Sequence, residues 1–450
     1  MELISQIPLV GGALGVLIPF LIVLTVVVFV HEFGHYIVGR WCGIGAEVFS
    51  IGFGKPLFGW TDRRGTRWQV AALPLGGYVK FTGDMDPASA GKADESELSD
   101  AQRRAAFHNA PLWARASTVL AGPMANFLLS ILIFAMLAIA IGRPAEDPVI
   151  AEVTEQAPTG LGFEAGDRVI SIGGESVSNF AEIVDLMHKS DGETLPATVE
   201  RDGEIRDITV TYRSAPTVDS ITPGMAAAQA GIVPGDRILS IEGEPVDSFY
   251  EVQLIAAEIE PDTPVEMVIE RGGEEMSFTF TPDVMERPHP VTGERVPQPT
   301  FGIRSSSTAA LQPLREPMGP FAAVGYGADQ TWMVISGTVS YLSDMIFANA
   351  DTSQLGGPIR IAEISGDKAE EGASSLIWLI AMLSTSIGLL NLFPIPVLDG
   401  GHLMFYAVEA LRGRPLGENW MQIGNMIGLS LVLFLMVFAT YNDLARVWSG

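Results

Sequence analysis

Long apolar stretches alternate with polar segments along this chain. The first apolar stretch runs from Leu9 to Val30 without a charged residue, and three others cover residues 116–141, 376–398 and 421–438. A run of about 18 or more apolar residues is typical of a helix that spans a bilayer. The pattern therefore predicts an α-helical polytopic membrane protein with four transmembrane helices. We expect the first span to be retained rather than cleaved as a signal peptide, because its leader is not basic and its apolar run is too long.

Between the second and third spans the pattern changes to short alternating strands, and this pattern occurs twice. Residues 166–172 (GDRVISI) recur as residues 235–241 (GDRILSI), at an offset of 69 positions. Each copy continues with a predicted helix, at 180–188 and 249–259, and with a glycine-containing hairpin. Two copies at this spacing indicate two α+β domains inserted in tandem, not a solenoid.

Residues 47–81 also alternate between apolar and polar positions, and they contain several glycines and aromatic residues. This stretch is too short, and too charged at 62–67, to span a bilayer. We predict one or two β-hairpins that enter the membrane from the cytoplasmic side, which is tolerable only against protein or a water-filled cavity. A soluble cytoplasmic loop is the alternative. Residues 321–347 are predicted to form an amphipathic helix in the membrane–water interface on the outer side of the bilayer.

Charge is unevenly distributed, and its distribution predicts the orientation of the spans. Residues 146–372 hold 13 Lys/Arg and 39 Asp/Glu, which accounts for the whole formal net charge of −26. Such an acidic block argues against nucleic acid and against anionic lipid as its partners. The loop 40–115 carries ten Lys/Arg and the loop 401–420 carries two. The positive-inside rule therefore places both loops in the cytoplasm and the acidic block outside. The single cysteine excludes an internal disulfide framework.

The strongest chemical signal is the motif His31-Glu32-Phe33-Gly34-His35 at the end of the first span. Histidines four residues apart share one helix face and can both bind one zinc ion, and Glu32 beside them can act as a general base toward water. Each ionisable group at membrane depth costs about 3 kcal/mol or more, so three of them on one turn indicate a compensating metal. The alternative is that these side chains only extend toward the interface at a helix end.

A third ligand is predicted from depth in the membrane. His31 and Asp399 each lie about 22 residues into a span that runs inward, which is about 33 Å at 1.5 Å per residue. Asp399 is therefore predicted to bind the same zinc ion near the cytoplasmic face. Two histidines and one carboxylate leave the fourth position open for water. A solvated helix cap is the alternative for Asp399, and His402 either stays outside the ligand set or replaces Asp399 in it.

Three motifs together resemble the site-2 protease family of intramembrane zinc metalloproteases: HEFGH, GPMAN at 122–126 and NLFPIPVLDGG at 391–401. The paired PDZ-like repeats resemble its bacterial branch, the regulators of sigma-E protease. The resemblance covers nearly the whole chain. It implies one Zn²⁺ ion per chain bound by His31, His35 and Asp399, with Glu32 as the catalytic base and Asn391 holding the substrate.

The resemblance also implies the reaction and its setting. This family cleaves single-pass membrane proteins within or beside their transmembrane segments, typically anti-sigma factors after a first extracytoplasmic cut, and also remnant signal peptides. The chain would accordingly be a multi-pass protein of a bacterial inner membrane. Its PDZ-like domains would be periplasmic and its active site would lie near the cytoplasmic face. The expected partners are the substrate and the lipid bilayer, and not nucleic acid.

Several alternatives remain open. A membrane metal transporter would use the same ligands, but transporters usually carry repeated halves in their spans, whereas the repeat here lies in the acidic block. A non-catalytic PDZ scaffold would not need Glu32. Asn391 could instead satisfy carbonyl groups freed by Pro394 and Pro396. The PDZ-like copies could bind peptides or only filter substrates by size. The string GLGF at 160–163 resembles a PDZ carboxylate-binding loop, but it aligns with a helix-to-turn segment of the second copy, so we interpret it as a coincidence.

These patterns divide the chain into ten segments. They are a transmembrane helix with HEFGH at 1–41, a membrane-associated β region at 42–83, a cytoplasmic linker at 84–115, a transmembrane helix at 116–142, PDZ-like domains at 146–213 and 216–283, an extended linker at 284–320, a periplasmic amphipathic segment at 321–372, a transmembrane helix with LDG at 374–401, and a transmembrane helix at 420–440.

Overall fold

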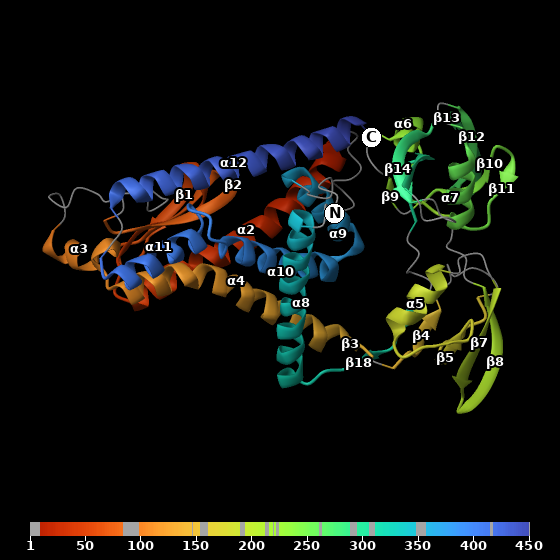
Figure 1. The fold of residues 1–450 in the computed structure, drawn as a ribbon, viewed down its shortest axis with the longest axis horizontal. Coiled ribbons are helices and arrows are strands. Elements are labelled where there is room, and N and C mark those ends of the chain that lie inside the picture. Colours follow the sequence, from red (N-terminus) through yellow and green to blue (C-terminus); the bar gives the residue numbers. More distant parts are fainter. Residues whose placement is uncertain are drawn as a thin grey trace. The chain divides into compact units, whose positions relative to one another are not determined.

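Figure 1 shows the computed structural model, which describes residues 10–83, 99–145, 147–153, 161–189, 194–211, 216–218, 220–221, 225–260, 263–288, 295–305, 311–347, 357–414 and 417–449. The chain forms two compact units. One comprises Met1–Ala140 with Met318–Asp443, and the other comprises Ile141–Pro317 with Leu444–Gly450. The predicted spans lie in the first unit and the sequence repeat lies in the second.

Four helices among the described residues are long and apolar enough to cross a membrane. Their apolar parts are Gly15–Trp41, Leu112–Ile141, Ala373–Asn391 and Trp420–Leu444. The four predicted spans are thus present as four apolar helices, as expected of a membrane protein. The complete helices are α2 (Val10–Trp41), α4 (Leu112–Ile141), α10 (Ala373–Asn391) and α12 (Glu418–Ser449).

The predicted transmembrane helix at 374–401 is shorter than predicted, and it ends where two prolines make a regular helix unlikely. α10 ends at Asn391, and a separate helix, α11 (Asp399–Arg412), begins after a break of seven residues. Pro394 and Pro396 lie in this break. Each lacks an N–H donor and disfavours helical conformation in the residue before it, which explains why the helix cannot continue.

Small and hydroxyl-bearing residues allow α2, α4 and α10 to pack closely. A Cβ at Gly34 of α2 would lie 2.4 Å from the carbonyl oxygen of Ala121 in α4, so only glycine permits this approach. The Ser130 hydroxyl of α4 donates to the carbonyl oxygen of Ala381 in α10 at 2.7 Å. Such interhelical hydrogen bonds stabilise helix pairs where lipid provides no hydrophobic driving force. The apolar core around them contains Val23, Val27, Ile133, Phe134, Leu379, Ile380 and Ala381.

A β-sheet occupies the region predicted to form one or two hairpins. It consists of two long, bent strands, β1 (Ala46–Thr61) and β2 (Arg67–Phe81), which pair with each other in more than one register. Residues 46–51 pair with 77–81 and also with 67–70, while residues 56–61 pair with 67–71. The segments therefore lie in the order 56–61, 67–71, 46–51 and 77–81, and residues 77–81 form one edge of the sheet.

Aromatic contacts and hydrogen bonds to one carboxylate hold this sheet against α2. The ring centroid of Phe49 lies 5.8 Å from that of Tyr36 on α2 and 4.3 Å from that of Trp68. At the turn between the strands, Asp62 accepts hydrogen bonds from the Tyr36 hydroxyl, the Trp68 indole and two backbone N–H groups of the turn. Desolvation opposes ionisation of Asp62, but these hydrogen bonds hold its pKa below the ordinary value.

The helices that lie between or beside the spans include α3 (Asp100–Ala105), η2 (Phe107–Asn109), α8 (Pro320–Phe347) and α9 (Pro358–Glu371). α8 runs across α4 and α10 rather than along them, as Figure 1 shows. The predicted linker at 84–115 is therefore partly helical, and the predicted segment at 321–372 contains two helices. Residues 84–98 and 348–356 of these predictions lie outside the described residues.

Two four-stranded sheets with the same strand order occur in the described part of the second unit. Their orders are β6-β5-β7-β8 and β11-β10-β12-β13. The first sheet contains β5 (Arg168–Ile172), β6 (Glu175–Ser176), β7 (Thr194–Arg201) and β8 (Glu204–Thr211), with α5 (Phe180–Lys189). The second contains β10 (Arg237–Ile241), β11 (Glu244–Pro245), β12 (Val265–Arg271) and β13 (Glu274–Phe280), with α6 (Ala226–Ala230) and α7 (Phe249–Glu258). Each sheet has its own apolar core.

The described residues of the segment predicted as an extended linker at 284–320 include paired strands, which corrects the prediction of a linker; residues 289–294 and 306–310 lie outside the described residues. The segment forms the hairpin β14 (Asp283–Pro288) and β15 (Arg295–Thr300), followed by β16 (Ile303–Arg304), β17 (Leu311–Pro313) and β18 (Arg315–Glu316). These last three strands pair with β9 (Ser220–Ile221), β4 (Ile150–Val153) and β3 (Arg143–Pro144) respectively. Pairing with earlier strands satisfies backbone N–H and C=O groups that an isolated proline-rich linker would leave to water.

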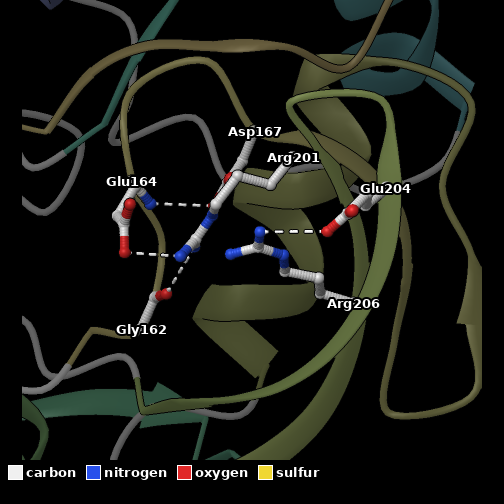
Figure 2. A network of polar contacts seen from close by, with 6 residues as sticks. All are labelled: Gly162, Glu164, Asp167, Arg201, Glu204 and Arg206. Atoms are coloured by element: carbon white, nitrogen blue, oxygen red, sulfur yellow. Dashed lines mark hydrogen bonds and ion pairs between the residues drawn. The ribbon is translucent and has the colours of Figure 1, made fainter.

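Figure 2 shows the ion-pair network that anchors the Gly-Asp motif of the first copy. The buried Asp167 carboxylate accepts hydrogen bonds from Arg201 Nε at 2.7 Å and from Arg201 Nη2 at 2.8 Å. Arg201 Nη2 also donates to the carbonyl oxygen of Gly162 at 3.3 Å. One arginine therefore neutralises a buried carboxylate and closes the turn that precedes the motif.

The second copy repeats this arrangement. Arg271 donates to the buried Asp236 carboxylate and to the carbonyl oxygen of Gly231. Burial opposes ionisation of Asp236, but the hydrogen bonds from Arg271 hold its pKa below the ordinary value. Gly162 and Gly231 are thus equivalent positions, and Gly231 caps the short helix α6. This equivalence supports the alignment in which the GLGF string corresponds to a helix-to-turn segment.

Candidate metal centre

Three predicted ligands meet although they lie up to 368 positions apart (399 − 31). His31 and His35 lie on adjacent turns of α2, and Asp399 is the first residue of α11. His31 Nε2 lies 3.2 Å from Asp399 Oδ2 and 3.2 Å from His35 Nε2, and His35 Nε2 lies 3.5 Å from Asp399 Oδ2. One possible ligand atom from each residue thus faces a common point, with all three within 4.8 Å of one another.

The break before α11 delivers Asp399 to this point. A Cβ at Gly400 would lie 2.2 Å from the carbonyl oxygen of Leu392, and a Cβ at Gly401 would lie 2.4 Å from that of Ile395. The pair of glycines after Asp399 therefore lets the start of α11 fold back tightly against the broken segment. A carboxylate in the first turn of a helix is also favoured by the helix dipole.

An ion pair holds the other end of α11 against α4. Arg115 Nη2 lies 2.6 Å from Glu409 Oε1, and Arg115 Nη1 lies 3.3 Å from Glu409 Oε2. The Arg115 guanidinium also lies over the Tyr406 ring, 5.1 Å from its centroid. A bidentate pair with a stacked guanidinium has a defined geometry, so it orients the helix that carries Asp399.

Helix α4 contacts the ring nitrogens of both histidines that point away from Asp399, and motif spacing did not predict these contacts. His35 Nδ1 lies 2.9 Å from the carbonyl oxygen of Thr118, and the side-chain amide of Asn126 lies 3.3 Å from His31 Nδ1. Between them, a Cβ at Gly122 would lie only 2.3 Å from His35 Nε2. The GPMAN string drew attention to Gly122 and Asn126 only through a resemblance, and nothing in the sequence singled out Thr118.

The residues present fit a zinc ion. Two imidazole nitrogens and one carboxylate oxygen are the donor set of many catalytic zinc sites, and ligands bound tetrahedrally at about 2.0–2.1 Å lie roughly 3.3 Å from each other. The observed separation of 3.2 Å between His31 Nε2 and His35 Nε2 is close to this value. Asp399 Oδ2 is buried beside the Nε2 atoms of His31 and His35, and no atom of the described residues forms a well-directed hydrogen bond with it. A cation would satisfy that oxygen.

A cavity of about 250 Å³ adjoins the three ligands. Glu32, Asn391 and His402 line it, as does Val79 of the sheet edge. The backbone of Val79 lies within hydrogen-bonding reach of Glu32. His402 borders the cavity but is not part of the three-residue ligand cluster. The structure therefore brings all five predicted site residues to one cavity, along with His402.

Comparisons with known proteins assign the chain to a family. The sequence model of peptidase family M50 matches residues 19–435. A protein of Agrobacterium fabrum named "Putative zinc metalloprotease Atu1380" is 41% identical over 440 residues, which is 97% of each chain. Metalloprotease MmpA of Caulobacter vibrioides is 33% identical over 97% of this chain and 96% of its own. Regulator of sigma-E protease RseP of Salmonella typhimurium is 33% identical over 95% of this chain and 98% of its own. Since the match covers most of the chain and the ligand cluster fits zinc, the chain belongs to peptidase family M50, the site-2 proteases, and is a zinc metalloprotease.

Proposed function

We propose that this metalloprotease hydrolyses peptide bonds within or beside the transmembrane segments of single-pass membrane proteins. One observation carries the proposal: His31, His35 and Asp399 converge between apolar helices, at a cavity bordered by the edge of a β-sheet. His31 and His35 lie on a membrane-spanning helix, where each ionisable residue costs about 3 kcal/mol or more. Their placement there is explained when the bond to be cleaved lies in the membrane as well.

The proposed roles divide among the residues around the cavity. When held by His31, His35 and Asp399, zinc supplies a Lewis acid for the scissile carbonyl group and makes water more acidic. Glu32 takes a proton from the attacking water and returns it to the leaving amine. Asn391, at the end of α10, donates and accepts hydrogen bonds with the substrate backbone, because its amide has both functions.

The sheet edge is the proposed binding place for the substrate strand. A transmembrane helix satisfies its carbonyl groups internally, so the substrate must unwind before a peptide bond can be attacked. An extended segment added to residues 77–81 would satisfy its backbone by β-augmentation. Gly77 packs so closely on α2 that a Cβ there would lie 3.1 Å from Glu32 Cγ. A strand added at this edge would therefore lie beside the catalytic carboxylate.

The second unit is proposed to control access. Its two copies share a strand order, which supports the interpretation as PDZ-like domains. The Lys/Arg bias of the loops favours a location of these domains outside, in the periplasm, with the active site near the cytoplasmic face of a bacterial inner membrane. α8, which crosses the spans, would lie in the outer interface.

The proposed substrates are anti-sigma-factor-like single-pass proteins that another protease has already cut outside, and also remnant signal peptides. The support is the similarity to a relative named regulator of sigma-E protease. A size filter formed by the acidic domains would explain why a first cut is needed, because it would exclude intact outer domains.

Glu32→Gln distinguishes proteolysis from other uses of the same site. The variant should keep its zinc, because Glu32 is not a ligand, and should lose cleavage of a single-pass test substrate. Crosslinking in the membrane should then trap the uncleaved substrate. A metal transporter or a PDZ scaffold would keep its function in this variant. Cleavage at the wild-type rate would overturn the role of Glu32, and full zinc content in His31→Ala would overturn the ligand set.

Removal of the second unit tests the filter. Since β18, β17 and β16 pair with β3, β4 and β9, the deletion has to cover residues 143–316 and needs a short linker. The shortened protein should bind zinc and cleave substrates with bulky outer domains that the full chain rejects. Loss of all cleavage in a folded, zinc-loaded protein would show instead that the domains are needed to assemble the site.

A further inference from the structure

The two zinc-binding histidines differ in what their second ring nitrogen meets. His35 Nδ1 lies 2.9 Å from the carbonyl oxygen of Thr118, which can only accept a hydrogen bond. His35 Nδ1 therefore carries the proton, and its Nε2 keeps a lone pair for a metal. Histidine ligands of zinc commonly donate their other N–H in this way to a carboxylate or a backbone carbonyl.

His31 meets a side chain instead. Its Nδ1 lies 3.3 Å from Asn126 Nδ2, and the other amide atom, Asn126 Oδ1, is buried without a hydrogen-bond partner among the described residues. If His31 Nε2 is to bind zinc, His31 Nδ1 must carry the proton, and its partner must then be an acceptor. Rotation of the amide by 180° about the Cβ–Cγ bond exchanges its nitrogen and oxygen within nearly the same volume. This rotation gives Asn126 Oδ1 the His31 N–H as its donor.

Asn126 is held in place for such a role by its surroundings. It is fully buried on α4, and its backbone carbonyl accepts a hydrogen bond from the Ser384 hydroxyl of α10 at 3.0 Å. A Cβ at Gly388 of α10 would lie 3.1 Å from Asn126 Cβ, so α10 packs closely against this residue. Burying an amide on a membrane-spanning helix costs free energy, and the contact of this amide with a metal ligand accounts for its presence there.

We infer that Asn126 is a positioning residue for the metal centre, whose side-chain oxygen accepts the Nδ1 proton of His31 and so keeps the Nε2 lone pair of His31 directed at zinc. Helix α4 then provides both acceptors: Asn126 Oδ1 for His31 and the Thr118 carbonyl oxygen for His35. The inference rests on the proposed ligand set, and its test separates the two.

Zinc affinity of the purified full-length protein, measured by competition with a chelator, is the readout. Asn126→Leu removes the acceptor and should weaken zinc binding by about 10–100-fold, as is typical when such a partner of a ligand is lost. Asn126→Asp keeps an acceptor oxygen in the same place and should bind zinc within about threefold of the wild type. Ser130→Ala is the matched control, because it removes a hydrogen bond between the same two helices, from the Ser130 hydroxyl to the Ala381 carbonyl oxygen, and leaves the contacts of Asn126 alone. It should bind zinc like the wild type.

The thermal unfolding of the zinc-free proteins separates positioning from packing. The zinc-free variants should unfold near the wild-type temperature, and Asn126→Ala replaces Asn126→Leu if the leucine prevents folding. Wild-type zinc affinity in the folded Leu or Ala variant would overturn the inference, and so would equal losses in the Asp and Leu variants. Unchanged zinc binding in His31→Ala would instead overturn the ligand set on which the inference rests.

Discussion

Replacement of Gly122 by alanine is the sharpest test of how α4 supports the metal centre. The added methyl carbon would lie 2.3 Å from His35 Nε2, 2.4 Å from His35 Cε1 and 3.0 Å from His31 Cε1. Non-bonded heavy atoms pack at about 3.5–4.0 Å. The imidazole of His35 or the backbone of α4 must therefore move by roughly 1 Å.

The His35 ring has little freedom to avoid the methyl group. Its Nδ1 is hydrogen-bonded to Thr118, which lies one turn before Gly122 on the same helix. Displacing the ring thus breaks that bond or turns Nε2 away from Asp399. Loss of a comparable supporting contact costs about 10–100-fold in metal affinity, which corresponds to about 1.4–2.7 kcal/mol. We expect Gly122→Ala to fall at the upper end of this range or beyond it, because the methyl group collides with a ligand itself.

Gly337→Ala is the matched control for this substitution. Gly337 lies inside α8, and a Cβ there meets nothing within 4 Å. Both substitutions gain about 1 kcal/mol of intrinsic helix propensity, of which an alanine before Pro123 loses a part. The contacts with His35 and His31 are therefore the main difference between them. Chelator competition and zinc content should show a loss in Gly122→Ala and no change in Gly337→Ala. Zinc binding of wild-type strength in Gly122→Ala would refute the close approach of α4 to the histidines.

Three further predictions concern the third ligand, the topology and the substrate. Asp399→Ala should lower zinc content and abolish cleavage, and 1,10-phenanthroline should inhibit the wild-type enzyme; full zinc occupancy in this variant would make His402 the third ligand. Ser178 is exposed in the second unit. In a chain whose Cys42 has been replaced, Ser178→Cys should therefore react with an impermeant thiol reagent in intact spheroplasts. Labelling only after lysis would show that the topology is the reverse of the predicted one. Asn391→Leu should keep zinc and thermal stability but lower kcat/KM by about tenfold or more, which corresponds to the loss of one hydrogen bond of about 1.4 kcal/mol. If the variant instead loses zinc or unfolds, while its folded fraction binds substrate normally, the role of Asn391 is structural.

Local patterns in the sequence determined much of this protein. Unbroken apolar runs predicted four spans because a helix of that length and composition must satisfy its backbone internally in lipid. The spacing of His31 and His35 predicted a shared helix face because the α-helix repeats every 3.6 residues. The depth argument predicted that Asp399 meets them, and its Oδ2 lies 3.2 Å from His31 Nε2. The chain reaches Asp399 through a break at Pro394 and Pro396, the two residues that made a regular helix unlikely there, so the helix of the third span ends at Asn391.

Contacts between distant segments were decided only by the tertiary structure. Nothing local to Thr118 or Asn126 shows which atoms of α2 they meet, because that depends on the distance and rotation between two packed helices. The pairing of β16, β17 and β18 with strands up to 173 positions earlier (316 − 143) was hidden for the same reason. Residues 77–81 form a sheet edge only because β1 and β2 bend and pair in more than one register. Periodicity specifies which face of an element is apolar, whereas packing specifies what that face meets.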